Sequence, residues 1–313
     1  KFMKQNLNHK TITCLIGDPV EHSVSDVMFQ YFAKLAGIKN YSHLKFRINS
    51  TNPENLKTAL NGISVFGIAG ANITLPYKES SMKYLNIVDR TVNLVGAVNT
   101  IVNKKGKIVG YNTDGYGALK TIETKLRPIK KSDMVVMFGA GGAARAIIGS
   151  LPKISCLTLL VRSSDLSKAK KLKEDFAHGD IKMEIELLTD KNIISTIKEA
   201  NLVINATPVG MYPKSNYSLI NKKHLKNISK RGIKKAMFFD AVFNPFETKF
   251  LKLAKQYGAK TCPGIYMMIY QGIEAFKLWT GKTVSAKHIE NISRVLQKTI
   301  NSKYEGLLKT RVY

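Results

Sequence analysis

The first segment with chemical potential carries two hydroxyls just before an expected helix. His22-Ser23-Val24-Ser25 places serines on alternate residues, after an apolar run and a Gly-Asp-Pro turn. Hydroxyls and the free amides of a helix N-terminus together suit a carboxylate. The plainer alternative is that Ser25 only caps the helix that follows.

A second polar segment ends in a lysine. Asn72 and Thr74 alternate on one face of an expected strand end, and Lys78 follows just past a proline. Asn99 and Asp114, in Val98-Asn99-Thr100 and Asn112-Thr113-Asp114-Gly115, add an amide and a carboxylate. Taken singly, Lys78 could be one of many surface lysines, and Asn-Thr-Asp-Gly is ordinary turn chemistry.

A glycine-rich turn indicates a dinucleotide site. The wholly apolar run Met134–Phe138 leads directly into a G-x-G-x-x-A pattern formed by Gly139, Gly141 and Ala144, and a helical stretch follows. In this setting the first glycine permits a tight turn, the second lets the backbone approach a pyrophosphate, and the small third residue allows close packing of helix on strand. The alternative is a tight turn without a ligand.

The end of the next expected strand bears on the choice of cofactor. An acidic residue there would hold the 2′-hydroxyl of NAD, whereas an arginine suits the 2′-phosphate of NADP. Arg162 stands nearest the strand end, with Ser163 and Ser164 beside it. This order favours NADP. Asp165 lies only a little further on and could cap the next helix or reach a ribose, so NAD remains an alternative.

These segments must be positioned by alternating strands and helices. In the first hundred residues the hydrophobic pattern predicts a small α/β unit, with helices after Ser25 and Pro53. Asn103-Lys104-Lys105-Gly106 predicts a hairpin turn. The strands expected here are Ile12–Ile16, Tyr41–Ile48, Val65–Ile73, Val98–Val102 and Lys107–Tyr111.

From about residue 114 the pattern changes to longer strand–helix–strand periods, which predict a doubly wound parallel sheet. Its expected strands are Met134–Phe138, Cys156–Val161, Ile185–Leu188, Leu202–Asn205 and Ala236–Phe239. Two later helical stretches, Ile265–Trp279 and Ser285–Ile300, are not needed to complete that sheet. The predicted fold class is therefore α/β with two domains: residues 1–113 completed by helices from 264–313, and a Rossmann-type domain over 114–263.

The composition excludes some classes of function. The chain has 313 residues, 44% of them hydrophobic, and a formal net charge of +27. The lysines are spread along the chain instead of clustering, which argues against a nucleic-acid binder. No stretch approaches the roughly 20 apolar residues of a membrane span. Three widely spaced cysteines, Cys14, Cys156 and Cys262, suggest buried thiols in the cytoplasm and neither a disulfide framework nor a metal site.

Taken together, the motifs resemble the shikimate dehydrogenase family, including its quinate/shikimate dehydrogenase branch. The matching segments run in family order over about residues 14 to 282. They are Gly17 to Ser25, Asn72 to Lys78, Gly96 to Thr100, Asn112 to Gly115, Gly139 to Ala144, Asn205 to Met211 and Gln271 to Gly281.

The resemblance implies a reversible, NADP-linked reduction of 3-dehydroshikimate in chorismate and aromatic amino-acid synthesis. It also implies Lys78 and Asp114 as the catalytic pair. Ser23 and Ser25 would bind the ring carboxylate, and the ring hydroxyls would be held by Asn72, Thr74, Asn99 and Gln271. The cofactor-binding residues would be Gly139, Ala140, Gly141, Gly142, Ala143, Arg162, Ser163, Thr207 and Gly264. A monomer or homodimer is expected, with a small-molecule substrate.

Three residues depart from the family pattern. Phe243 stands where the family usually has tyrosine, Pro263 where aspartate is common, and Tyr266 where a small residue is common. These departures leave the preference for shikimate or quinate open. They also leave open a ligand-sensing homologue without catalysis, although the presence of both Lys78 and Asp114 argues against it.

Overall fold

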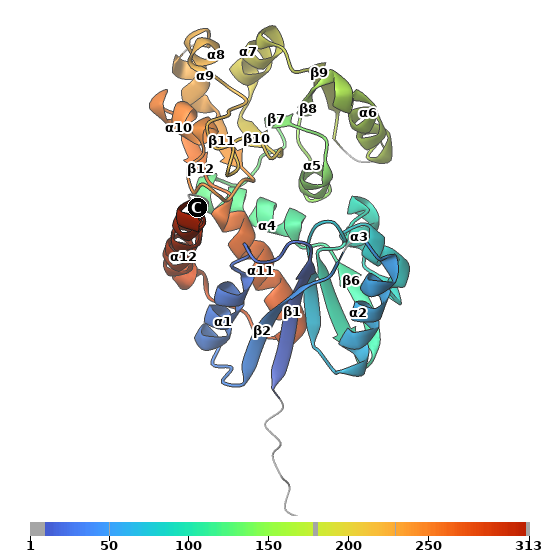
Figure 1. Cartoon of the computed structure of the whole chain (residues 1–313). Coiled ribbons are helices and arrows are strands. Elements are labelled where there is room, and N and C mark those ends of the chain that lie inside the picture. The colour runs from blue at the N-terminus through green and yellow to red at the C-terminus, as the bar shows by residue number, and fades with distance from the viewer. Residues whose placement is uncertain (1–9, 50, 178–180, 229, 311–313) are drawn as a thin grey trace, which may run out of the picture. The chain divides into compact units, whose positions relative to one another are not determined.

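A computed structural model describes residues 10–49, 51–177, 181–228 and 230–310 (Figure 1). The chain forms two compact units. One consists of Lys1–Thr113 with Gly272–Tyr313, and the other of Asp114–Gln271. The first boundary therefore falls between Thr113 and Asp114. The second falls within one continuous helix, α11 (Ile265–Thr280), so that this helix contributes residues to both units.

The first unit contains, among its described residues, a six-stranded mixed sheet in the order β2-β1-β3-β5-β6-β4. Its strands are β1 (Thr11–Gly17), β2 (Tyr41–Arg47), β3 (Gly70–Ile73), β4 (Ile87–Val88), β5 (Thr100–Lys104) and β6 (Lys107–Tyr111). Its helices are α1 (Ser25–Leu35), α2 (Pro53–Val65), the 3₁₀ helix η1 (Ser80–Tyr84), α3 (Arg90–Val95), the 3₁₀ helix η4 (Ala286–His288) and α12 (Ile289–Thr310).

Pairing in this sheet changes direction at its centre. Strand β1 pairs in parallel with β2 and β3, whereas β5 pairs antiparallel with both β3 and β6. The predicted hairpin between β5 and β6 is present. Lys105 and Gly106 form its tip with φ of 54° and 87°, the left-handed values that a two-residue type I′ turn requires.

The two faces of the first sheet are covered by different helices. Because side chains alternate along a strand, Cys14 and Ile16 face α2 and α3, where they pack with Leu60 and Val92. Phe29 of α1 contacts both His43 and Trp279, which places α1 and the end of α11 on the other face.

Close packing of α11 on the first sheet depends on a glycine. A Cβ on Gly70 would lie 2.3 Å from Nε1 of Trp279, and that same indole nitrogen donates to the Ile101 carbonyl at 2.8 Å. The Trp279 ring therefore packs on the sheet at a position where the strand residue, Gly70, has no side chain.

The second unit has, within its described part, a six-stranded sheet whose strands all run parallel, in the order β12-β11-β10-β7-β8-β9. This is the Rossmann order read from the opposite edge. The strands are β7 (Met134–Phe138), β8 (Cys156–Val161), β9 (Met183–Leu187), β10 (Leu202–Asn205), β11 (Met237–Asp240) and β12 (Lys260–Cys262). The helices besides α11 are α4 (Asp114–Thr121), the π-helical turn η2 (Ile122–Leu126), α5 (Gly142–Ile148), the 3₁₀ turn η3 (Ser163–Asp165), α6 (Leu166–Asp175), α7 (Asp190–Glu199), α8 (Lys222–Lys226), α9 (Lys230–Lys235) and α10 (Lys249–Gln256).

The central strands β7, β8, β10 and β11 are buried on both faces, as their apolar runs predict. Met137 belongs to one core cluster with α5 and β8, and Phe138 belongs to another with α7 and α10. Strands β7, β8 and β10 have the bounds expected from the sequence, whereas β9 and β11 are displaced by one or two residues.

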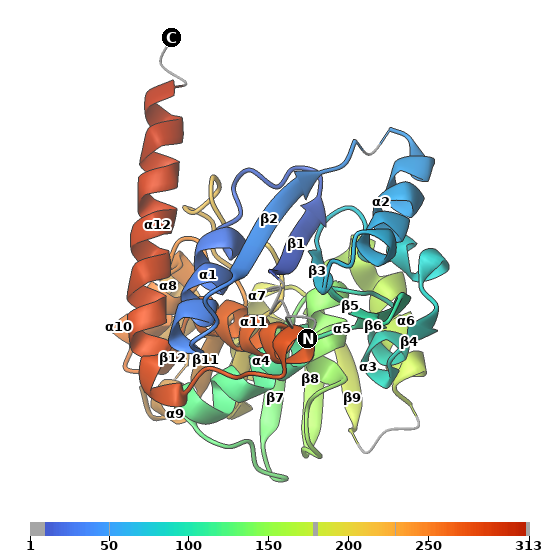
Figure 2. The ribbon, with the colours of Figure 1, turned by 90° about the horizontal axis from the view of Figure 1, so that it is seen from below.

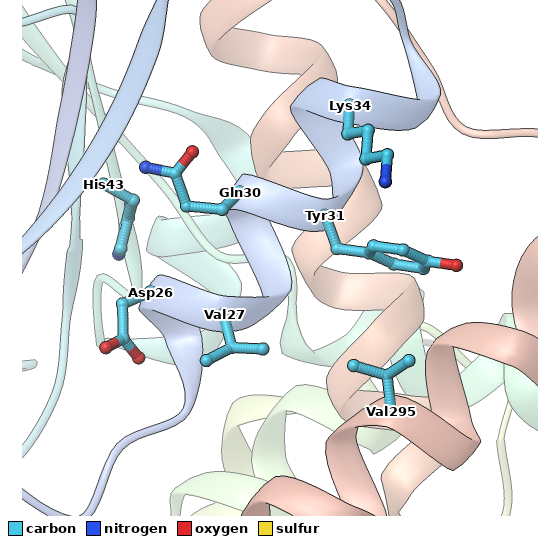
Figure 3. A pocket seen from close by; sticks show the side chains of 7 residues that line it. All are labelled: Asp26, Val27, Gln30, Tyr31, Lys34, His43 and Val295. Carbon is cyan, nitrogen blue, oxygen red and sulfur yellow. The ribbon is translucent and has the colours of Figure 1, made fainter.

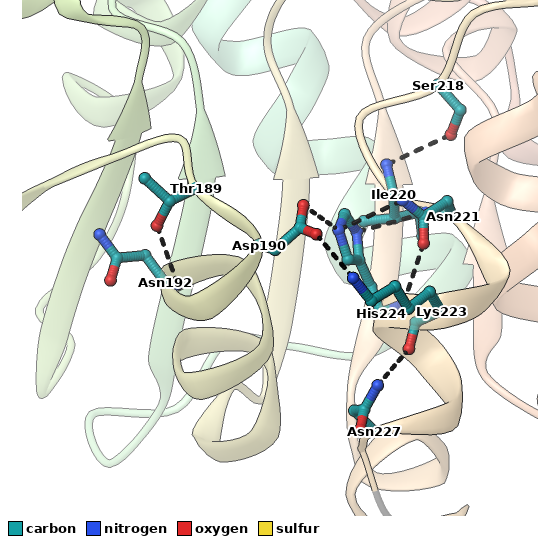
Figure 4. A network of polar contacts seen from close by, with 9 residues as sticks. All are labelled: Thr189, Asp190, Asn192, Ser218, Ile220, Asn221, Lys223, His224 and Asn227. Atoms are coloured by element: carbon teal, nitrogen blue, oxygen red, sulfur yellow. Dashed lines mark hydrogen bonds and ion pairs between the residues drawn. The ribbon is translucent and has the colours of Figure 1, made fainter.

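A polar network joins α7 to α8 in the second unit (Figure 4). Asp190, the first residue of α7, accepts from Nε2 of buried His224 at 2.9 Å. Asn221 and His224 form a reciprocal capping box at the start of α8. His224 therefore both caps α8 and joins this helix to α7 through its bond to Asp190.

The expected strand start at Val65 was wrong, and the alternatives in which Ser25 and Asp165 cap helices do not hold. Val65 ends α2 instead of starting a strand, and Phe66 beyond it is 79% exposed, so β3 begins only at Gly70. Ser25 is the first helical residue of α1 rather than its cap: the N-cap is Val24, without a side-chain hydrogen bond. Asp165 precedes α6 but makes no capping bond to it.

The expected burial of the three cysteines is confirmed. Cys14, Cys156 and Cys262 are free and buried. Burial raises the pKa of the Cys14 thiol to about 12. No helix within the described ranges is long and apolar enough to cross a membrane.

Asp240 at the end of β11 is a fully buried carboxyl group. Its Oδ1 accepts from Asn205 Nδ2 and from the Val242 amide, both at 2.9 Å, and its Oδ2 accepts from Thr248 Oγ1 at 2.6 Å. Burial raises the pKa of Asp240 from 3.8 to about 7, against the lowering effect of these three bonds.

We expect Asp240→Asn to gain stability relative to wild type as the pH rises from 4 to 7. In this interval the folded carboxyl holds a proton that the unfolded one has lost, so the wild-type stability contribution of Asp240 falls with rising pH. The difference in unfolding free energy should change by on the order of 2 to 4 kcal/mol, at about 1.4 kcal/mol for each pKa unit. Urea titrations followed by circular dichroism measure it. A difference that stays constant from pH 4 to pH 7 would contradict the expectation.

Candidate active site

The polar residues predicted in the first unit gather along one edge of its sheet. Strands β1 and β3 are parallel, so the segments that follow Gly17 and Ile73 leave from the same edge. Because β5 runs the other way, its start at Thr100 lies opposite Asn72, and the end of β6 at Tyr111 lies opposite Thr100. The same edge therefore carries Asn72, Asn99 and the residues after Tyr111.

Hydrogen bonds fix the amides at this edge. Asn72 Nδ2 donates to the Asn99 carbonyl and to Thr100 Oγ1, both at 3.2 Å. Asn99 Oδ1 accepts from the Thr113 amide at 2.9 Å, and Asn99 Nδ2 donates to Thr113 Oγ1 at 3.0 Å. All four residues are buried. These hydrogen bonds fix the orientation of the Asn72 and Asn99 side-chain amides. The sequence did not reveal this role of Thr100 and Thr113.

The segment that carries Lys78 is held by hydrogen bonds to β1 and to a residue just before β5. The Thr74 amide donates to the Ile16 carbonyl at 2.9 Å, and the Val98 amide donates to the Lys78 carbonyl at 2.8 Å. Between them, buried Tyr77 donates its hydroxyl to the Ile48 carbonyl at 2.7 Å. Lys78 is half-buried, and the hydrogen bond from Val98 holds its backbone in place.

The two serines before α1 are in mutual contact. The Ser25 amide donates to Ser23 Oγ at 3.1 Å, and Ser23 Oγ donates to Ser25 Oγ at 3.0 Å. Both side chains are half-buried. Two hydroxyls on adjacent sides of one turn can bind the two oxygens of a carboxylate.

Asp114 is the first residue of α4 in the second unit. Two glycines allow this helix to pack closely: a Cβ on Gly115 would lie 2.3 Å from the Ala146 carbonyl oxygen, and one on Gly117 would lie 2.7 Å from the Met267 carbonyl oxygen. Gln271 of α11 is the last residue of this unit and donates Nε2 to the Met268 carbonyl at 2.8 Å.

The glycine turn lies where the order of the second sheet reverses. Gly139 follows β7 and Thr207 follows β10, the two central strands on either side of the reversal. Gly139 has φ of 97°, and a Cβ there would lie 2.6 Å from Thr207 Cγ2. Ligands of such sheets bind in the crevice at this point.

The backbone beyond Gly139 is open to a ligand. An added Cβ on Gly141 or Gly142 would meet nothing within 4 Å, and both residues are exposed at the start of α5. Ala144 is fully buried in the core, as expected of the third position of the pattern. Ala140 and Ala143 are partly buried against the same core. The turn thus offers helix amides to an anion over a side-chain-free surface.

Thr207 and Gly264 complete the predicted cofactor set. Thr207 donates its hydroxyl to Asn205 Oδ1 at 2.7 Å and accepts from the Val209 amide at 3.1 Å. A Cβ on Gly264 would lie 2.5 Å from the Ala241 carbonyl oxygen, so only glycine fits where α11 begins. Of the residues that depart from the family pattern, Tyr266 lies under the Lys125 ammonium, 4.2 Å from its ring centre.

Arg162 and Asp165 form an ion pair at the end of β8. Arg162 Nη2 lies 2.7 Å from Asp165 Oδ2, and Nε donates to the same oxygen at 2.8 Å. The Arg162 side chain is 71% exposed, and Ser163 beside it is exposed. The carboxylate therefore orients the guanidinium and does not cap α6.

A separate cavity of about 460 Å³ lies beside α1 (Figure 3). It contains none of the predicted site residues. Its lining is Asp26, Val27, Gln30, Tyr31, Lys34, His43 and Val295. Burial lowers the pKa of His43 to about 3, so its ring is neutral. Among the described residues, His43 Nε2 and Asp26 Oδ1 have no hydrogen-bond partner.

Comparison with known proteins identifies the family of this chain. A family model described as the shikimate dehydrogenase substrate binding domain matches residues 15–101, and the shikimate 5′-dehydrogenase C-terminal domain matches residues 264–292. A curated shikimate dehydrogenase (NADP(+)) of Methanococcus maripaludis is 39% identical over 289 residues, which cover 92% of this chain and 95% of that protein. The chain belongs to the shikimate dehydrogenase family.

Solved structures of family members have the same fold. A crystal structure of a shikimate dehydrogenase in complex with NADP⁺ is 36% identical, with a TM-score of 0.77 over 91% of this chain and 94% of that one. A shikimate 5-dehydrogenase from Listeria monocytogenes, in complex with shikimate and NAD, is 29% identical, with a TM-score of 0.81 over 92% of this chain and 96% of that one. The family resemblance and the two-part α/β architecture expected from the sequence are confirmed.

We expect Gly139→Ala to destabilise the protein by roughly 1 to 3 kcal/mol, because alanine must adopt φ of 97° against Thr207. Gly142→Ala is the matched control. It adds the same methyl group to a helical position with open space, and should be neutral or stabilise by about 0.4 to 1 kcal/mol. Unfolding free energies from urea titration measure both. Equal effects of the two substitutions would contradict this account of the turn.

Proposed function

We propose that this chain catalyses the reversible NADP-dependent interconversion of 3-dehydroshikimate and shikimate. The observation that carries the proposal is the polar edge of the first sheet, where fixed amides, paired hydroxyls and a lysine lie in the region matched by the substrate-binding model. The second unit supplies a Rossmann sheet with an open glycine turn at its switch point. We further propose that the enzyme acts in the cytoplasm, in chorismate and aromatic amino-acid synthesis.

The substrate would be held by groups that match its chemistry. Ser23 and Ser25 bind the ring carboxylate through their paired hydroxyls. Asn72 and Asn99, with their amide orientations set by Thr100 and Thr113, and Thr74 and Gln271 hold ring hydroxyls. A ring with one carboxylate and several hydroxyls needs this division into anion-binding and amide-lined parts.

The residues of the glycine turn and of the β8 end fit a phosphorylated dinucleotide. The surface over Gly141 and Gly142 would be filled by side chains at any other residue type, and Arg162 presents a cation beside Ser163. Gly139, Ala140, Ala143, Thr207 and Gly264 shape the same end of the sheet. The bound dinucleotide supplies or accepts the hydride.

Lys78 would handle the proton. As the carbonyl carbon of 3-dehydroshikimate gains hydride, negative charge grows on its oxygen, and an ammonium within hydrogen-bond reach stabilises that charge and donates a proton. In the oxidation of shikimate the lysine takes the hydroxyl proton instead. Asp114 orients the Lys78 ammonium and a substrate hydroxyl.

We expect Lys78→Met to lower kcat for shikimate oxidation by about 10²- to 10⁴-fold, the usual contribution of a positioned acid or base. Lys83→Met, five residues on and exposed, is the control and should retain full activity. Initial rates of reduced-cofactor formation from shikimate and from quinate, each with NADP and with NAD, provide the measurement. Folded wild-type protein that is silent in all four combinations would refute the proposed function.

Arg162 should determine the preference for NADP over NAD. Loss of a hydrogen-bonded charge pair costs about 1.5 to 3 kcal/mol, so Arg162→Gln should raise the KM for NADP by about 10- to 100-fold and leave the KM for NAD within about two-fold. Lys168→Gln is the control, because Lys168 is also exposed and lies 3.8 Å from Asp165. If Asp165→Asn instead abolishes NAD turnover in a protein that prefers NAD, the NAD-dependent alternative is correct.

A further inference from the structure

Two lysines from distant parts of the first unit converge on the backbone of the serine pair. Lys45 Nζ, on β2, donates to the Ser23 carbonyl at 3.2 Å. Lys303 Nζ, on α12, donates to the same oxygen at 2.7 Å. Both lysines are half-buried. A single carbonyl oxygen thus holds two ammonium groups beside the hydroxyls that would bind the substrate carboxylate.

The charge around Ser23 is not balanced by the carboxylate beside it. Asp26 Oδ2 lies 3.1 Å from Lys45 Nζ. The negative charge of Asp26 also favours the charged form of Lys303. Two ammonium groups and one carboxylate leave one excess positive charge. Burial and the neighbouring Lys45 lower the pKa of Lys303, while Asp26 raises it.

Such an arrangement is costly unless an anion binds nearby. Like charges repel strongly when partly removed from water, and the cost falls when a negative group approaches. The Ser23 and Ser25 hydroxyls belong to the same turn as the carbonyl that the lysines hold, and Ser23 Oγ bonds both the Ser25 amide and hydroxyl. The excess charge therefore lies next to the hydroxyl pair.

Lys303 lies beyond the segment that the C-terminal domain model matches. The C-terminal domain model ends at residue 292, whereas α12 extends beyond it beside α1 (Figure 2). The helix is held by the buried side chains of Ile289, Ile292, Leu296 and Ile300. Its attachment to the unit therefore does not depend on the lysine.

We propose that Lys303, acting with Lys45, is a positioning residue for the substrate carboxylate. The two ammonium groups fix the Ser23–Ser25 turn through the Ser23 carbonyl and attract the carboxylate to it. This inference rests on the proposed function, in which the serine pair binds the ring carboxylate. It adds a contribution from the C-terminal helix to substrate binding.

The test compares Lys303→Met with Lys303→Arg and with Lys298→Met, which removes the same charge from an exposed site on the same helix. Steady-state rates are measured with shikimate and with its uncharged methyl ester, at saturating NADP. Loss of a partly exposed charged hydrogen bond predicts a KM for shikimate about three- to ten-fold higher in Lys303→Met, with kcat within about two-fold of wild type. Lys303→Arg and Lys298→Met should match wild type, and the KM for the methyl ester should change by less than about two-fold in every variant.

A purely structural role gives a different result. If Lys303→Met raises the KM for shikimate and for the methyl ester equally, or behaves like Lys298→Met, the proposal is wrong. Thermal unfolding of each variant shows whether the fold is retained. If wild-type protein does not turn over shikimate, the proposed function fails, and calorimetric titration with shikimate then tests the lysine by itself. Equal dissociation constants for wild type and Lys303→Met, or no binding by either, would overturn this inference.

Discussion

The parallel alignment of neighbouring strands determines where chemistry can occur in both units. In the first unit, pairing of β1 with β3 brings the segments after Gly17 and Ile73 to one edge, and the reversed direction of β5 adds Asn99 there. In the second, pairing of β7 with β10 brings Gly139 against Thr207. Parallel strands need long crossovers, and these crossovers are the helices that cover the sheets. Polar groups at the strand ends can therefore gather at one edge, while central strands such as β7 and β10 stay buried.

The packing of both units also depends on glycines at close contacts. Gly70 admits the Trp279 ring, Gly115 and Gly117 admit neighbouring backbone along α4, and Gly264 admits the Ala241 carbonyl. Each of these positions would place a Cβ within 3 Å of another atom. The open glycines, Gly141 and Gly142, differ because no atom of the protein fills the space above them. Packing therefore requires glycine at Gly70, Gly115, Gly117 and Gly264, but not at Gly141 and Gly142.

Much of this could be predicted from the sequence, because the decisive signals are local. The five-residue apolar run before Gly139 fixed the bounds of β7, and the Lys105-Gly106 turn fixed the hairpin. Val65 and Phe66 misled the prediction because they are exposed apolar residues at a helix end, and hydrophobicity alone does not separate this case from a buried strand. Lys303 gave no signal, because it is one of 49 Lys and Arg residues and its partner lies 280 positions away. Which lysine reaches Ser23 depends on tertiary structure.

The position of Trp279 also determines what optical experiments can report. It is the chain's single tryptophan, it is 9% exposed, and its contacts with Gly70, Ile101 and Phe29 all lie in the first unit. Its intrinsic fluorescence is therefore a spectroscopic label for the sheet of the first unit alone. Far-ultraviolet signals, by contrast, average the helices and strands of both units. Tryptophan fluorescence therefore follows the melting of the first unit, whereas circular dichroism follows the melting of the whole chain.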